Sequence, residues 1–344
     1  GNENTFTNHE QNYVNQENVV PSTASTIKER NNAFFFEYSR PTPIGQLMAG
    51  LRYEHVNSDY YEQGVYSPAH SRTYSQWFPS LTFATKIKEV GLQLSYSAKT
   101  SRPSYRQLGT NVEYMNRFTR QSGNPTLKPE TLHNITLVSS WSWLTFVANY
   151  TQTHNKIMYW NEQESTDENI TNLRYRNFKR FPALTLSLTA APRMGVWSPQ
   201  LILFCQKQWF DIERLGSKLD LSKPIWGILW NNTFDFKDNW IAETRLKVTS
   251  KGITENSELT RNNCAFNFSV RKAFLNDRLS VTVGVNDLFN RSAKQLLLYT
   301  NNLSIDTKQE LDSREFYVTL RYKFNTARSK YKGTGAGQSE RKRF

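Results

Sequence analysis

The sequence contains many segments in which apolar and polar residues alternate with a period of two. Successive side chains of a β-strand point to opposite faces of the sheet, so each such segment predicts a strand with one apolar face. The segments exceed the usual length of about 5–6 residues for a strand in a soluble protein. The clearest alternation places Phe316, Val318, Leu320, Tyr322 and Phe324 on one face, and further examples are 91–99, 144–151, 184–189, 264–271 and 279–286.

The connections between these segments are alternately short and long. Outer-membrane barrels have short periplasmic turns on one rim and longer extracellular loops on the other. Counting the alternating segments predicts about 13 or 14 antiparallel strands between Asn31 and Asn325. The predicted short turns are 41–43, 86–89, 141–142, 192–195, 237–239 and 276–278, and the long polar connections are 59–72, 101–130, 162–168, 213–223, 251–258 and 293–313.

The composition suits a membrane barrel better than a helical membrane protein. Only 38% of the residues are hydrophobic and the mean hydropathy is -0.66, yet 14% are aromatic. A membrane-spanning helix needs about 20 mostly apolar residues in a row, and the sequence has no such run. A soluble β-sandwich with an aromatic core is the alternative, but the aromatic residues gather near predicted strand ends, as interfacial belts do. Examples are Trp141, Trp143, Tyr159, Trp160 and Trp240.

The formal net charge of +13 comes from 43 Lys and Arg residues against 30 Asp and Glu residues. These charges are spread along the chain without a recognisable nucleic-acid-binding module, so we expect no nucleic-acid partner. Membrane lipid and phosphate-rich lipopolysaccharide are equally suitable electrostatic partners for a basic protein.

No residue pattern indicates catalysis, a metal site or a cofactor. Cys205 and Cys264 are too few for a disulfide scaffold, and the five histidines are isolated from one another. The sequence lacks the nucleophile elbow, the zinc-binding helix and the phosphate-binding loop. We therefore expect no catalytic residue, no metal and no cofactor, although a barrel enzyme with scattered catalytic residues is a remaining alternative.

The first residues, Gly1 to Glu29, are polar and lack the apolar centre of a signal peptide. Because an exported barrel needs such a signal, we expect either a mature protein or a C-terminal piece of a longer one. The pattern divides the chain into a polar N-terminal segment or extracellular loop (1–30), a transmembrane β-barrel (31–325) and a basic tail (326–344).

Three motifs stand out against the alternation. Ser101-Arg102-Pro103 is followed by Gly123-Asn124-Pro125-Thr126-Leu127-Lys128-Pro129-Glu130, and a late segment reads Gly284-Val285-Asn286-Asp287-Leu288-Phe289-Asn290. The third is the end of the last strand, Arg321-Tyr322-Lys323-Phe324-Asn325. Proline fixes φ and removes a backbone donor, so the first motif predicts a defined crossover before strand pairing resumes at Ile135.

Together these motifs resemble the C-terminal barrel region of TonB-dependent outer-membrane receptors. The resemblance implies an all-β, antiparallel up-and-down transmembrane barrel, with this chain as part of 22 strands. It also implies import of a scarce nutrient, such as a metal chelate, a cofactor or a glycan. Energy would come from the TonB complex through a plug domain that this sequence does not contain. The positions that carry the resemblance are Gly123, Asn124, Pro125, Leu127, Pro129, Glu130, Asn286, Leu288 and Phe289.

One long connection combines cationic and aromatic residues and is our candidate ligand-binding loop. We expect it to help capture the ligand, and the alternative is that it only caps the barrel. A plugless porin-like channel is the second functional hypothesis for the chain. The candidate residues are Arg102, Tyr105, Arg106, Tyr114, Arg117 and Phe118.

Overall fold

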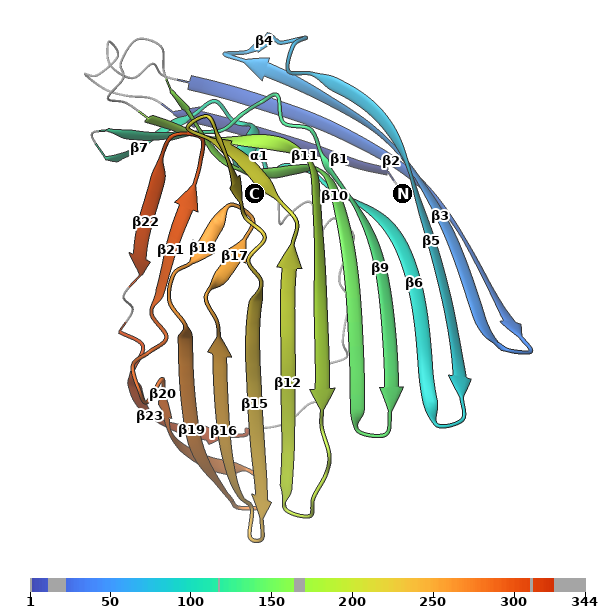
Figure 1. Ribbon diagram of the computed structural model, residues 1–344, viewed down its shortest axis with the longest axis vertical. Helices are drawn as coiled ribbons and strands as arrows, with labels where there is room; N and C mark the ends of the chain where they lie inside the picture. Colours follow the sequence, from blue (N-terminus) through green and yellow to red (C-terminus); the bar gives the residue numbers. More distant parts are fainter. Residues whose placement is uncertain (1, 12–22, 117, 164–170, 310–311, 325–344) are drawn as a thin grey trace.

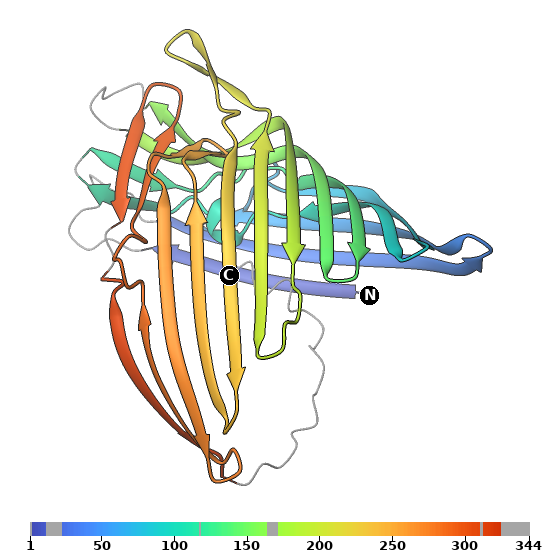
Figure 2. The ribbon, with the colours of Figure 1, turned by 60° about the horizontal axis from the view of Figure 1, so that its bottom comes forward.

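The structure is an open, strongly curved antiparallel sheet in which neighbouring strands run up and down (Figures 1 and 2). The computed structural model describes residues 2–11, 23–116, 118–163, 171–309 and 312–324. The sheet contains 17 strands, and fourteen of them pair consecutively as its wall. These are β1 (Asn2–Gln11), β2 (Thr23–Thr42), β3 (Gly45–Glu62), β5 (Arg72–Ile87), β6 (Val90–Ser101), β9 (Glu130–Trp141), β10 (Leu144–Gln163), β11 (Thr171–Ala190), β12 (Trp197–Gln208), β15 (Ile225–Phe236), β16 (Trp240–Thr249), β19 (Asn263–Phe274), β20 (Leu279–Asn286) and β23 (Glu315–Tyr322).

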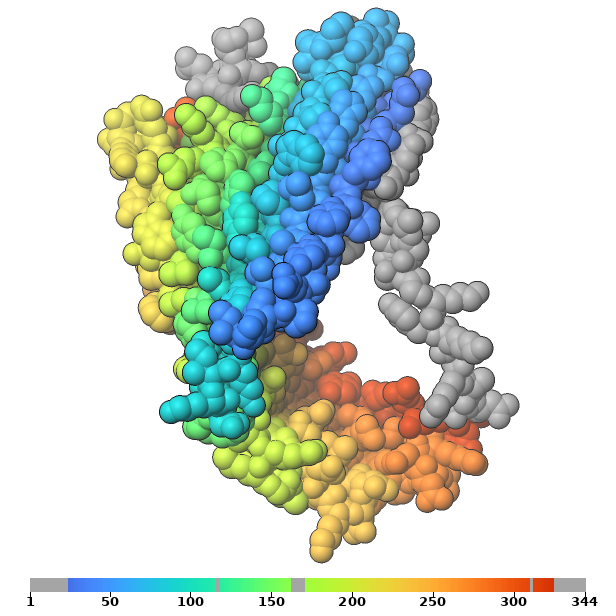
Figure 3. Space-filling model, turned by 90° about the vertical axis from the view of Figure 1, so that its right-hand side faces the viewer, coloured from blue at the N-terminus to red at the C-terminus, as the bar shows by residue number. Residues whose placement is uncertain are grey.

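This architecture confirms the predicted all-β, antiparallel, up-and-down fold. The wall does not close in the described residues, because β1 and β23 lie at opposite ends of the sheet and do not pair with each other. Figure 3 views the open side, where the N-terminal strands (blue) and the C-terminal strands (orange to red) are separated at the lower end. The residues before Asn31, which the sequence pattern leaves outside the barrel, contribute β1 and the start of β2 to the sheet.

All six predicted short turns join consecutive wall strands at one rim. Several contain residues with positive φ, as tight hairpin turns require: Lys88 (54°), Ser142 (50°), Asp238 (56°) and Asn239 (58°). The predicted long connections join the strands at the other rim, except that 164–168 of the predicted connection 162–168 lie outside the described residues. Most of the others have secondary structure of their own. They contain β4 (Val65–Tyr66), α1 (Tyr105–Leu108), β7 (Val112–Asn116), β8 (Thr119–Ser122), β13 (Asp211–Arg214), β14 (Ser217–Asp220), β17 (Gly252–Thr254), β18 (Ser257–Leu259), β21 (Lys294–Tyr299) and β22 (Ser304–Gln309).

Several of these long connections pack together. Strands β17, β18, β21 and β22 form a separate four-stranded sheet, and an apolar cluster joins the β13–β14 hairpin to β10, β11 and β17. Trp160, which the sequence pattern places in an interfacial belt, is buried in this cluster. Its neighbours there are Met158, Phe181, Phe210, Ile212, Leu221 and Ile253. Within the described residues, no helix is both long and apolar enough to cross a membrane.

The register of the wall separates an apolar face from a polar face. Directly opposed residues of antiparallel strands point to the same face. Leu203 is opposed by Leu188 and by Ile228, which continues an apolar row around the wall. Arg245 is opposed by Asn231 and by Asn267, which gives a polar row on the other face of the wall. The first face is therefore suited to lipid and the second to the lumen.

Substitution of Leu186 by Arg tests this facing. Leu186 lies on the apolar face of β11, and an Arg near the middle of the bilayer costs about 2–4 kcal/mol. We expect the variant to lose about that much stability in lipid vesicles, measured by equilibrium unfolding in denaturant. The matched control is Thr185→Arg, the next residue on the lumen face. Equal destabilisation by both substitutions would contradict the assignment.

Candidate functional site: the mouth of the barrel

The connection from β6 to β9 begins with a short capped helix, α1. Ser104 is its N-cap: the Ser104 Oγ accepts a hydrogen bond from the Gln107 amide at 3.2 Å, and the Gln107 Oε1 accepts one from the Ser104 amide at 2.8 Å. This reciprocal capping box satisfies two donors that a helix start otherwise leaves unpaired. The helix then directs Tyr105 and Leu108 into an apolar cluster, where both are buried.

That cluster shows that the connection folds inward. Tyr105, Leu108 and Leu127 of the connection pack with Ile27 of β2 and Tyr60 of β3, while Ile157 of β10 and Tyr175 of β11 pack against the same cluster. Strands β5, β6 and β9 separate β3 from β10 in the sheet. A single segment contacts both sides only across the concave face, so the connection lies within the mouth of the barrel (Figures 1 and 2).

Two of the predicted ligand-binding residues are buried inside the protein. The Arg102 Nη2 lies 2.7 Å from the Glu54 Oε2, and its Nη1 lies 3.7 Å from the Glu29 Oε1. All three side chains are buried. A buried guanidinium is stable only when it is paired, so Arg102 fastens the start of the connection to β2 and β3. Tyr105 is completely buried, so protein atoms cover both residues.

The family-like motif at Gly123 forms the other half of this anchor. A Cβ at Gly123 would overlap the carbonyl oxygen of Gly109, so only glycine permits this approach to the end of α1. The Asn124 amide donates to the Gln107 carbonyl at 2.6 Å. Its side-chain amide donates to the Tyr175 carbonyl at 2.8 Å. The glycine and asparagine therefore hold the connection against both α1 and β11.

The rest of the motif is also in contact with the wall. Pro125 and Leu127 are buried, Pro129 is half-buried, and the Pro125 carbonyl accepts a hydrogen bond from Arg72. Strand pairing resumes at Glu130, earlier than the predicted Ile135. The Glu130 Oε1 accepts a hydrogen bond from the Ile157 amide at 2.7 Å. The motif therefore connects β9 to β10 at the point beyond which β10 extends past its neighbour β9.

The groups that remain accessible at the mouth surround a polar hollow of about 210 Å³. Arg106 donates to Glu113 at 2.5 Å, and this contact raises the pKa of the Arg106 guanidinium above its usual value. The Tyr175 hydroxyl donates to the Tyr159 hydroxyl. Burial and this hydrogen bond raise the pKa of Tyr175, so its phenol stays neutral. The hollow is lined by Arg106, Gly109, Asn111, Glu113, Gln121, Ser122, Gly123 and Tyr175.

The other predicted loop residues do not line this hollow within the described part of the chain. Tyr114 and Phe118 have exposed side chains, and the guanidinium of Arg120 lies 5.2 Å from the centre of the Tyr114 ring. Arg117 lies outside the described residues. No local motif in the sequence identifies Glu113 or Tyr175 as ligand-binding residues, because only the inward fold brings them to Arg106.

The late motif lies at the end of β20 and the start of the connection that follows it. Asp287, buried at the end of β20, accepts hydrogen bonds from the Arg291 amide at 3.1 Å, from the Ser292 amide at 3.0 Å and from the Ser313 hydroxyl. Asn286 donates to Glu315 at 3.1 Å, and the Leu288 amide donates to the Phe266 carbonyl at 2.9 Å. Phe289 contacts the Phe266 ring with 5.6 Å between the centroids. These positions shape the connection from β20 to β21.

The lumen face of the wall carries a second polar hollow of about 280 Å³. It brings Glu243 and Arg245 of β16 together with Asn231 of β15, Asn267 of β19 and Tyr317 of β23. Among the described residues, no group of three or more His, Cys, Asp or Glu side chains is arranged to hold a metal ion.

Comparison with known proteins gives the family. A profile described as "Outer membrane protein beta-barrel family" matches residues 1–322, so the chain belongs to this family and lies in the bacterial outer membrane. Comparison with curated protein sequences found no match.

Solved structures share the fold at low sequence identity. The copper transporter OprC has a TM-score of 0.57 and 13% identity, over 88% of this chain and 48% of that one. The Serratia marcescens hemophore receptor HasR has a TM-score of 0.57 and 14% identity, over 93% and 55%. The Pseudomonas aeruginosa ferric enterobactin receptor PfeA has a TM-score of 0.52 and 13% identity, over 93% and 58%. The chain thus spans about half the length of the proteins it resembles.

Replacing Arg102 by Ala tests the anchoring of the connection. The substitution leaves the Glu29 and Glu54 carboxylates buried without the cation that pairs with them. Breaking a buried ion pair in this way costs about 3–5 kcal/mol. We expect a corresponding loss of stability by denaturant unfolding, with new proteolytic cleavage between β6 and β9. The control is Arg106→Ala at an exposed position, and a stable Arg102→Ala variant would refute the anchor.

Asp287 gives the protein a defined acid sensitivity. Burial alone would raise the pKa of its carboxyl, but hydrogen bonds from Ser292, Ser313 and the Arg291 amide outweigh burial and lower the pKa. A lowered folded-state pKa stabilises the protein above the ordinary value of 3.8, and this stability is lost as pH falls through the folded-state pKa. We expect Asp287→Asn to cost about 1.5–3 kcal/mol at neutral pH. The loss relative to wild type should shrink below pH ~4, measured by thermal unfolding, and a constant difference from neutral to acidic pH would contradict this role.

Proposed function

We propose that the chain forms the outer wall and part of the ligand-capturing mouth of an outer-membrane receptor that imports a scarce nutrient. The observation that carries the proposal is the β6–β9 connection, which is anchored inside the mouth and leaves Arg106, Glu113 and Tyr175 around a polar hollow. A polar lumen face lies below the mouth. Such an arrangement gives a ligand a polar path from the outer surface into the lumen.

The solved structures of similar fold support transport over the alternative of an outer-membrane enzyme. Their titles describe a copper transporter, a receptor for a hemophore and heme, and a ferric enterobactin receptor. We propose a metal chelate, a cofactor or a glycan as the nutrient class. We also propose that a plug domain fills the lumen against the polar face and receives energy from the TonB complex.

The open wall supports a barrel larger than the described strands. In a bilayer, unpaired backbone groups at a sheet edge cost several kcal/mol each, and both β1 and β23 have a free long edge in the described residues. We propose that further strands pair with these edges to give a 22-stranded barrel. The competing hypothesis is a plugless channel, which predicts constitutive conductance in planar bilayers.

Binding to the mouth can be tested with three probes: a ferric catecholate siderophore, heme and cupric ion. We expect one probe to bind the full-length protein in isolated outer membranes and Arg106→Ala to weaken that binding at least tenfold, because the guanidinium faces the hollow. A tenfold change in Kd corresponds to about 1.4 kcal/mol. The control is Arg193→Ala in a short turn at the opposite rim.

The same preparation separates the two hypotheses. Uptake of the bound probe by cells, abolished by a protonophore, supports an energised receptor. Uptake that continues at the same rate without a proton gradient, together with steady conductance, would refute the receptor and support the channel. Unchanged affinity in Arg106→Ala would remove the mouth from ligand capture.

A further inference from the structure

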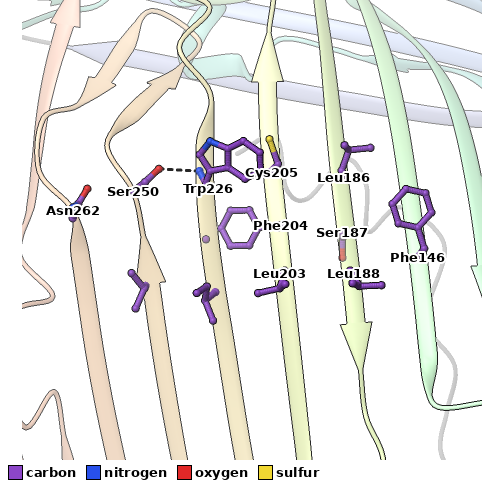
Figure 4. Close-up of a pocket in the computed structure, with 13 residues that line it drawn as sticks. Phe146, Leu186, Ser187, Leu188, Leu203, Phe204, Cys205, Trp226, Ser250 and Asn262 are labelled. Atoms are coloured by element: carbon purple, nitrogen blue, oxygen red, sulfur yellow. Dashed lines mark hydrogen bonds between the residues drawn. The ribbon is translucent and has the colours of Figure 1, made fainter.

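The apolar face of the wall is hollowed where β11, β12 and β15 meet. This wall groove, defined by Phe146, Leu186, Leu203, Cys205, Trp226 and Ile228, has a volume of about 470 Å³ (Figure 4). Ligand-binding pockets commonly have volumes of about 300–1,000 Å³. The groove is therefore large enough for part of a ligand, although it lies on the face opposite the lumen.

The register explains why a groove forms at this place. Cys205 lies directly between Leu186 on β11 and Trp226 on β15. Its side chain is much shorter than either neighbour, so it forms the floor between two walls. In the next row of the same face, Leu203 lies between Leu188 and Ile228, which keeps the lower end of the groove apolar.

Residues that point to the lumen face of the wall close the back of the groove. Phe204 is opposed by Ser187 and by Gly227, and a Cβ at Gly227 would overlap the Phe204 ring. The ring therefore covers the backbone of β15 on the lumen face. The groove is open on the apolar face, which contacts the membrane.

One end of the groove is polar and lies at the rim of the long connections. Trp226 is near the start of β15, directly after such a connection, and its amide donates to the Ser250 Oγ at 2.8 Å (Figure 4). Ser250 and Asn262 line this end. Long connections mark the extracellular rim of an outer-membrane barrel, so the polar end points toward the headgroups of the outer leaflet.

The side chain of Lys207 places a positive charge at the same end. Lys207 lies on the same face of β12 as Cys205, because the two are separated by one residue. Its Nζ is 5.6 Å from the centre of the Trp209 ring, and in the described residues no carboxylate forms an ion pair with it. Lysine and tryptophan are characteristic of a membrane interface. The hydrocarbon groove thus ends beneath a positive charge at headgroup height.

We propose that the wall groove binds one acyl chain of a phosphate-bearing outer-leaflet lipid, with Lys207 in contact with the lipid phosphate. The apolar lining matches hydrocarbon, the polar end matches the ester and sugar region, and Lys207 matches the negative charge. A zwitterionic headgroup carries a cation beside its phosphate, so it lacks the net negative charge that this end selects. This inference rests on membership of the outer-membrane family and does not depend on the proposed nutrient transport.

The test is native mass spectrometry of the full-length protein released from detergent micelles that contain lipid A. We expect the wild type to retain one lipid A molecule and to retain phosphatidylcholine at least tenfold less. Cys205→Trp fills the floor of the groove, and Lys207→Gln removes the charge. Each should reduce lipid A retention at least tenfold.

Matched controls separate groove occupancy from general lipid contact. Val283→Trp adds the same side chain to the apolar face of β20 outside the groove, and Lys237→Gln removes a lysine at a short turn on the opposite rim. Both controls should retain lipid A as the wild type does. Heat-dependent gel mobility checks that each variant is folded, and Lys207→Gln keeps the test decisive if Cys205→Trp does not fold. Equal retention by Lys207→Gln and wild type, or equal retention of phosphatidylcholine and lipid A, would overturn the proposal.

Discussion

A sheet that crosses a bilayer must pair its own backbone hydrogen-bonding groups, because hydrocarbon offers no replacement for water. This requirement sets the character of the whole wall. Consecutive strands pair in antiparallel register at tight turns, and the long ladders leave one face for lipid and the other for the lumen. The same requirement applies to the edges of β1 and β23 that are unpaired within the described residues, and it is the reason for our proposal that further strands pair with them.

The extension of β10 and β11 beyond the regular wall links the wall to the mouth. The ladder between these strands skips Asn155, which has a positive φ of 55°. Beyond that point, Ile157 and Tyr175 pack on the cluster around α1, whereas Met158 and Trp160 belong to the cluster beneath the β13–β14 hairpin. A strand that is apolar on both faces must be covered on both faces. The β6–β9 connection and the base of the β13–β14 hairpin therefore pack on this extension.

The roles of the arginine and lysine side chains differ with their burial. Arg102 is buried between two carboxylates and fixes the start of the connection, whereas Arg106, in α1 of the same connection, stays accessible at the hollow. On the apolar face of β12, Lys207 lies two residues beyond Cys205 of the wall groove. Burial thus separates the anchoring side chain of Arg102 from the accessible cations to which our proposals assign ligand capture and lipid contact.

The sequence by itself determined the fold class, the alternation of short and long connections and the polarity of the two faces. These follow from a period of two, which is a local property of the chain, so Leu320 and Leu186 reveal their facing without any knowledge of their neighbours. It also marked the motif at Gly123 as a fixed crossover. Only the tertiary structure decided that Arg102 and Tyr105 are covered, that Trp160 is buried and that Tyr175 faces Arg106. The physical reason is distance along the chain: Arg102 meets Glu54, and Cys205 lies between Leu186 and Trp226, only after distant strands are brought into register.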